Sequence, residues 1–145
     1  MNIKPKLGID KLLFGMNQQD VEVLFGKPDK QFQDDDKNII QVFNLQKCRL
    51  TFYADEDFRL GYIISSNSES TLFDQSVIGK NIGEVKSELL LQGLKEWEQE
   101  DFDLTENHFN EDNWLVLQSE FGKIVKIEIG AIINDKDEFD WKFGK

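Results

Sequence analysis

The sequence predicts an α+β domain in which short helices pack on one face of an antiparallel β-sheet, as two tandem helix-plus-strands repeats. A capped helix motif occurs twice, and after each copy the apolar residues recur at every second position. The length points the same way, because 145 residues fit one domain with a core of its own. We expect repeats at about residues 7–66 and 72–133, followed by a C-terminal segment, 134–145.

The first helix is expected to begin after Asn17, which is a good N-cap residue. Asp20 stands three positions later, where its carboxylate completes a capping box. A glycine followed closely by a proline, at Gly26 and Pro28, ends the helix. Its expected core side chains recur at helical spacing: Val21, Leu24 and Phe25.

The second helix repeats this arrangement. Asn81 is its expected N-cap, Glu84 follows three residues later, and Gly93 ends the helix. The apolar side chains again recur at helical spacing, at Ile82, Val85 and Leu89. The echo of the first motif indicates an internal duplication.

Strands are expected where the apolar residues alternate with polar ones. In the first half these are 39–45 and a hairpin of 48–53 with 58–64, and in the second half 114–120 and 124–133. One face of such strands is apolar and the other polar, which is typical of an antiparallel sheet.

Two further segments have alternative assignments. Residues 94–102 alternate acidic and other side chains, which favours a strand with an acidic face, and a helix is the second possibility. Phe139, Trp141 and Phe143 alternate in the tail, 134–145. This spacing predicts a final edge strand or a segment that docks on the sheet or on a partner.

The chain is strongly acidic, with 17 basic and 28 acidic residues and a formal net charge of −11. This balance argues against nucleic acid as a ligand, because phosphate binding needs a basic surface. The charge serves solubility or complements a basic partner. Cys48 is the single cysteine, so no internal disulfide forms, and its apolar neighbours place it in the core. Without an apolar signal region or a membrane-length apolar run, we expect a cytoplasmic protein away from membranes.

No catalytic motif is evident. The single histidine, His108, lies in a polar stretch and is expected on an exposed loop, without a nucleophile motif near it in the sequence. The acidic runs lack the ligand spacing of a calcium loop, so we expect solvated turns and no metal. No glycine-rich phosphate loop occurs, so no cofactor is expected, and the chain is not expected to be an enzyme.

The segment Leu12 to Asp29 resembles the opening of SmpA/OmlA-like domains. This group includes the small lipoprotein of the outer-membrane barrel-assembly machinery and the β-lactamase inhibitor protein. The resemblance implies a β-lactamase-inhibitor-protein-like fold with a free sheet face that binds proteins, although this chain lacks the lipobox cysteine of the one and the disulfide cysteines of the other. The residues that carry it are Phe14-Gly15-Met16, Asn17, Val21 to Phe25 and Gly26-Lys27-Pro28, with a looser second copy at Ile78 to Gly93.

Acidic residues interleaved with aromatic ones are the expected binding surface, because interfaces favour aromatic anchors and complementary charge. A core tryptophan beside surface acids would give the same pattern. We expect a monomer that acts as a protein-binding antagonist, most concretely an immunity protein covering a basic toxin such as a nuclease. The alternatives are an assembly module or a small-ligand carrier. The expected partner-binding residues are Asp55, Glu56, Asp57, Trp97, Glu98, Glu100, Asp101, Asp112 and Trp114.

Overall fold

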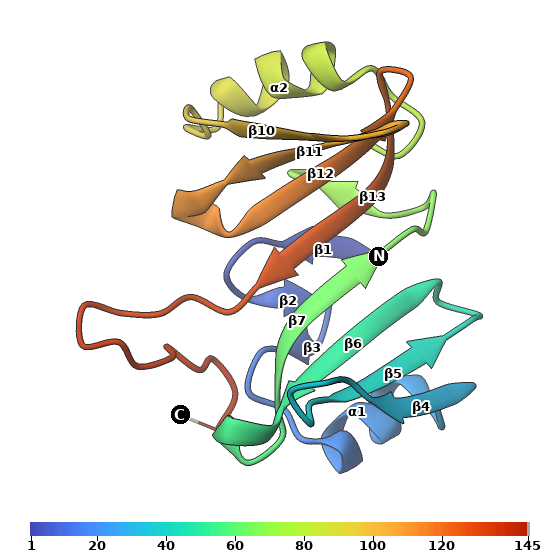
Figure 1. Ribbon diagram of the computed structural model, residues 1–145, viewed down its shortest axis with the longest axis vertical. Helices are drawn as coiled ribbons and strands as arrows, with labels where there is room; N and C mark the ends of the chain where they lie inside the picture. Colours follow the sequence, from blue (N-terminus) through green and yellow to red (C-terminus); the bar gives the residue numbers. More distant parts are fainter. Residues whose placement is uncertain (145) are drawn as a thin grey trace.

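The structure is a computed structural model that describes residues 1–144. In this range the chain is mostly β, with two sheets and two short α-helices (Figure 1). The helices are α1 (Gln18–Phe25) and α2 (Ile82–Leu90). The large sheet is antiparallel and has eight strands in the order β10-β11-β12-β13-β7-β6-β5-β4. Their bounds are β4 (Lys30–Gln33), β5 (Ile39–Phe43), β6 (Cys48–Tyr53), β7 (Arg59–Ser65), β10 (Glu98–Phe102), β11 (Thr105–Asn110), β12 (Leu115–Glu120) and β13 (Lys123–Gly130).

A second, five-stranded sheet has the order β3-β2-β1-β8-β9. The N-terminal segment supplies three of its strands, and the connection between the two halves of the large sheet supplies the other two. Each strand has only two or three residues, too short to show an alternating pattern. These strands are β1 (Asn2–Lys4), β2 (Gly8–Ile9), β3 (Leu12–Leu13), β8 (Thr71–Leu72) and β9 (Gln75–Ser76).

The predicted fold class, α+β with a helix-on-sheet tandem repeat, is therefore wrong. The described chain is mostly sheet, its helices have only eight and nine residues, and a second sheet shares the core. The expected repeat boundaries, 7–66 and 72–133, remain a prediction. No helix in residues 1–144 has the length and apolar character needed to cross a membrane.

Both predicted helix starts are confirmed. The Asn17 side chain accepts from the Asp20 backbone N–H at 2.8 Å, and the Asp20 carboxylate accepts from the Asn17 N–H at 3.0 Å. At α2, the Asn81 side chain accepts from the N–H groups of Gly83 and Glu84. Each side chain satisfies donors that the first helical turn leaves free.

The predicted core stripes are only partly correct. In α1 only Val21 is buried, and Leu24 is 39% exposed. In α2, Val85 and Leu89 are buried. A two-turn helix presents too few positions for a full stripe to face the core.

The large sheet consists of two four-stranded meanders, β4 to β7 and β10 to β13, joined by the antiparallel pair β7 and β13. The predicted hairpin is confirmed as β6 with β7, and the predicted strands at 114–120 and 124–133 are β12 and β13, which also pair with each other. The strand assignment for 94–102 holds for β10, and the helical alternative is wrong. The polar strand β11 was not predicted.

One face of the large sheet is covered and the other is not. The buried core contains side chains from the small sheet, both helices and the covered face of the large sheet, among them Ile3, Val21, Val85, Leu50 and Leu117. Cys48 belongs to this core as predicted, and burial raises the pKa of its thiol to about 11. On the opposite face, no helix of the described chain packs, and we call it the open face.

The tail does not form the predicted edge strand. Its one strand-like pairing in the described chain is an isolated bridge between Ile133 and Phe139. The tail docks on its own fold instead: Phe139 stacks on Trp141, which is 6% exposed, and the backbone N–H groups of Lys142 and Phe143 donate to the carbonyl of Phe14. Lys145, the last residue of the predicted segment, lies outside the described residues.

Candidate binding surface on the open face

The open face carries one row of side chains that crosses all eight strands. Consecutive members are register partners, so their side chains point to the same side of the sheet. The row is acidic at its β10 end and basic at its β4 end. In spatial order it runs Glu98, Phe109, Val116, Glu128, Ile64, Arg49, Val42 and Lys30.

The acidic half of this row lines a hollow of about 480 Å³, which we call the acidic hollow. Three carboxylates line it, from β10 and β13, and no lysine, arginine or histidine of the described chain does. Apolar side chains from β11 and β12 add to the lining, and Tyr62, Gln99 and Asn107 complete it. The residues that matter for its chemistry are Glu98, Glu100, Glu128, Tyr62, Phe109 and Val116.

Tyr62 and Glu128 are fixed by each other. The Tyr62 hydroxyl donates to the Glu128 carboxylate at 2.5 Å, across the junction of β7 and β13. Burial raises the pKa of the Tyr62 hydroxyl, and the hydrogen bond to Glu128 raises it further. The tyrosine therefore stays a neutral donor, and Glu128 is held as its acceptor.

The structure brings together only part of the predicted binding set. Glu98 and Glu100 line the acidic hollow. Asp101 points to the covered face, because it pairs with Glu106 and its carboxylate accepts from the Gln99 side chain. Asp55 and Glu56 lie in a 3-10 turn that follows β6, and Asp57 comes directly after it, far from β10 in the large sheet (Figure 1).

The two predicted tryptophans mainly support the fold. Trp97 is partly buried, packs against the core and lies under the Lys86 ammonium, 5.6 Å from the ring centre. Trp114 is 37% exposed and covers Gly130 so closely that a β-carbon there would lie 2.2 Å from the indole. Asp112 is exposed in the turn before Trp114.

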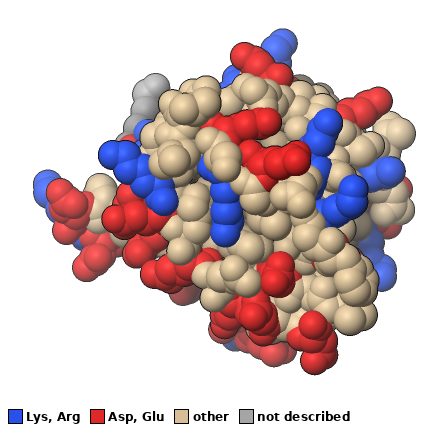
Figure 2. Space-filling model, turned by 90° about the horizontal axis from the view of Figure 1, so that it is seen from above, with Lys and Arg blue, Asp and Glu red and all other residues tan. Residues whose placement is uncertain are grey.

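Charge on the surface is mixed. Figure 2, viewed from the end that carries α2 and β10, shows Asp and Glu side chains interspersed with Lys and Arg. The net charge of −11 is thus not one continuous acidic field on this end. Local hollows therefore decide what the protein attracts at close range.

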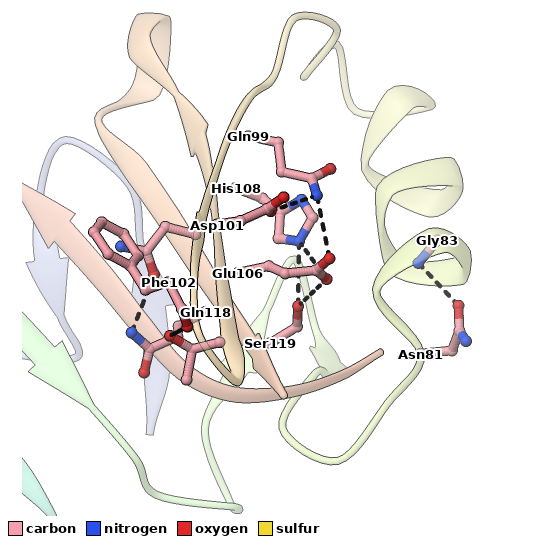
Figure 3. A network of polar contacts seen from close by, with 11 residues as sticks. Asn81, Gly83, Gln99, Asp101, Phe102, Glu106, His108, Gln118 and Ser119 are labelled. Carbon is pink, nitrogen blue, oxygen red and sulfur yellow. Dashed lines mark hydrogen bonds and ion pairs between the residues drawn. The ribbon is translucent and has the colours of Figure 1, made fainter. Parts of the chain in front are cut away.

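On the covered face, His108 belongs to a network of polar contacts (Figure 3). It is 3% exposed in β11, so the predicted exposed loop position is wrong. Its Nε2 lies 3.2 Å from the Ser119 hydroxyl, which donates to Glu106 at 3.1 Å. Because that hydroxyl has one proton, His108 is the donor to Ser119. Gln99 donates to Glu106 and Asp101.

This order of donors does not suit nucleophilic catalysis. A catalytic serine gives its proton to histidine, and an acid accepts from the other imidazole nitrogen. Here histidine donates to Ser119, and its Nδ1 has no hydrogen-bond partner in the described chain. No group of three His, Cys, Asp or Glu side chains in residues 1–144 is arranged to hold a metal.

We expect stability to fall as the pH drops below about 6.5, the ordinary pKa of histidine. Burial lowers the pKa of His108, and the Lys86 charge lowers it further, against the opposing effect of Glu106 and Asp101. Below pH 6.5 the unfolded chain therefore binds a proton at this histidine before the folded chain does. The free energy of unfolding is highest above pH 6.5, and it decreases as the pH falls from 6.5 toward the lowered pKa of the folded state. Urea unfolding of wild type and His108→Gln between pH 7.5 and 5.5 tests this. Equal slopes for the two proteins would contradict it.

The sequence matches no known protein-family profile and no curated protein. The fold is similar to parts of two larger solved structures. One is an extracellular protein containing an SCP domain from Bacillus anthracis str. Ames, 9% identical with a TM-score of 0.50 over 79% of this chain and 42% of that one. The other is a cysteine-rich secretory protein from Staphylococcus aureus subsp. aureus Mu50, 14% identical with a TM-score of 0.51 over 88% of this chain and 46% of that one.

These comparisons correct several expectations. The chain spans less than half the length of either solved chain that it matches. The resemblance to SmpA/OmlA-like domains and the β-lactamase-inhibitor-like fold are wrong, since the neighbours are SCP-type proteins with a sheet-rich part like this one. Their descriptions as extracellular and secretory also contradict the predicted cytoplasmic location, which the immunity-protein interpretation assumed. A toxin-neutralising role is tested by neither comparison. At such identities the likeness concerns the fold alone.

Proposed function

We propose that this chain is a protein-binding module that holds a positively charged polypeptide segment on the open face. A lysine or arginine of the partner occupies the acidic hollow. The observation that carries the proposal is the lining of that hollow, with carboxylates of Glu98, Glu100 and Glu128 and no basic residue of the described chain. The proposed role is binding without catalysis.

The lining of the hollow suits both parts of a long basic side chain, its apolar stem and its charged head. Val116 and Phe109 offer apolar surface to the methylene stem, and the carboxylates accept from the charged head. Because Tyr62 fixes Glu128, this acceptor is oriented before the ligand arrives. Pre-organised acceptors reduce the entropy that binding loses.

Peptide titration tests the proposal. The probe is a capped glycine-lysine peptide with two lysines, added to nitrogen-15-labelled protein and followed by amide chemical shifts. We expect shifts at residues of the acidic hollow and, in Glu98→Gln/Glu100→Gln, an affinity about tenfold lower, roughly 1.4 kcal/mol. Both glutamates are exposed on an edge strand, so the fold tolerates the change.

The matched control is Glu84→Gln/Glu88→Gln. It removes the same charge from exposed positions of α2, away from the open face. We expect its affinity to stay within about twofold of wild type, since distant surface charges are screened. Equal weakening in both double variants would show that net charge alone attracts the peptide and would refute the site.

A further inference from the structure

A second hollow, of about 310 Å³, lies on the same open face and has the opposite charge. We call it the cationic hollow. Lys47, Arg49 and Lys126 line it, together with the polar side chains of Asn44 and Ser66. No aspartate or glutamate of the described chain lines it, although the sequence contains 28 acidic residues.

The three cations of this hollow are not neutralised within the fold. The ion pairs of the described chain involve His108 and Lys142, and none includes Lys47, Arg49 or Lys126. The Arg49 guanidinium lies 5.7 Å from the centre of the Phe32 ring. That contact holds it on the open face but leaves its charge available, because the ring carries no net charge.

The two hollows meet on the central strands. Glu128 and Arg49 belong to the same row, with only Ile64 between them. Two strand spacings place their backbones about 10 Å apart, and Lys126 is two residues from Glu128 on β13, about 7 Å away. An extended peptide advances about 3.3 Å per residue, so about three residues span the distance from one hollow to the other.

We propose that the cationic hollow binds a carboxylate of the same segment whose basic side chain occupies the acidic hollow. The ligand is then an extended polypeptide that crosses the strands and carries Lys or Arg about three positions from Asp or Glu. The inference rests on the proposed function and adds the charge pattern of the partner. Complementary charges at both hollows give the ligand one orientation and favour it over segments that carry basic residues alone, which bind more weakly.

Two capped hexapeptides test the charge pattern, one with lysine and glutamate three positions apart among glycines, the other with glutamine in place of the glutamate. We expect the first to bind about tenfold more tightly and to shift amides of both hollows. Arg49→Gln/Lys126→Gln should abolish this difference and leave the affinity for the glutamine peptide unchanged or slightly higher. Lys95→Gln/Lys136→Gln, which removes the same charge at exposed positions elsewhere, should preserve it.

The outcomes separate the two proposals. If both peptides shift the acidic hollow equally, the bipolar ligand is refuted and the basic-segment site stands. If neither peptide binds, both proposals fail. A third peptide, with lysine and glutamate adjacent, should bind more weakly than the peptide in which they are three positions apart. Equal affinity of these two peptides would refute the spacing. If inorganic phosphate occupies the cationic hollow as tightly as the bipolar peptide does, the hollow is a general anion site and the inference is overturned.

Discussion

Gly8→Ala is expected to cost about 4 kcal/mol or more of the free energy of unfolding, enough to unfold many domains of this size. Gly8 has φ of +146°, a conformation that side chains with a β-carbon rarely adopt. A β-carbon at this position would lie 1.8 Å from the carbonyl oxygen of Leu12. That oxygen belongs to the backbone of the paired strand, so relief requires separating β2 from β3.

Gly26→Ala is the matched control for Gly8→Ala. Gly26 also has a positive φ, +78°, but a β-carbon there would meet nothing within 4 Å. Its ψ of −164° lies in a region that is populated almost only by glycine. We therefore expect the conformational cost alone, about 1–3 kcal/mol. Urea unfolding followed by tryptophan fluorescence measures both. Similar losses for the two variants would show that the contact with Leu12 is relieved easily and would contradict the prediction.

Phe14→Ala is expected to lower the free energy of unfolding by about 3–5 kcal/mol, the usual cost of truncating a buried phenylalanine. Phe14 is 0% exposed, and its carbonyl also accepts the backbone hydrogen bonds that hold the tail. The lower free energy of unfolding has two causes: less apolar surface is buried on folding, and a cavity remains where the ring was.

Phe121→Ala provides the comparison for Phe14→Ala. Phe121 is 84% exposed in the turn between β12 and β13, so its removal should change stability by less than about 0.5 kcal/mol. Chemical unfolding with an unchanged m-value makes the two numbers comparable. A loss below about 1.5 kcal/mol for Phe14→Ala would mean that the core closes around the missing ring.

Local signals could be predicted from the sequence. The caps at Asn17 and Asn81 act within three residues, so the sequence alone places both helix starts. The hairpin of β6 and β7 could be predicted as well, because buried and less buried residues alternate along β6 and only residues 54–58 separate the two strands. These features depend on neighbours in the chain and not on the tertiary fold.

The strand β11 shows why other elements were missed. Its inward positions carry Glu106, His108 and Asn110, so the strand has no apolar alternation to recognise. The hydrogen bonds that these side chains do form go to Ser119, Gln99 and the Glu96 carbonyl, which come from other segments, and His108 Nδ1 has no partner in the described chain. A polar core network of this kind is visible only after the strands have paired.

The candidate site, likewise, could be predicted only in part from the sequence. Glu98 and Glu100 stand in an acidic run, and the sequence singled them out. Glu128 and Tyr62 reach the same hollow only through the register of β7 with β13, which joins distant parts of the chain. The motif at Leu12 to Asp29 led to the wrong fold prediction, because a capped helix is a local feature that many folds share.

The pair of β7 and β13 has a consequence for how the sheet is assembled and kept closed. Each meander forms from strands adjacent in the chain, whereas this junction of four register pairs joins residues as distant as Tyr62 and Gly130. Such a non-local contact forms slowly, and until it does both strands are free edges that another molecule's strand can occupy. The Tyr62–Glu128 hydrogen bond crosses the junction, and both hollows border it. A segment bound across the two hollows would thus hold β7 and β13 together and oppose the exchange of strands between molecules.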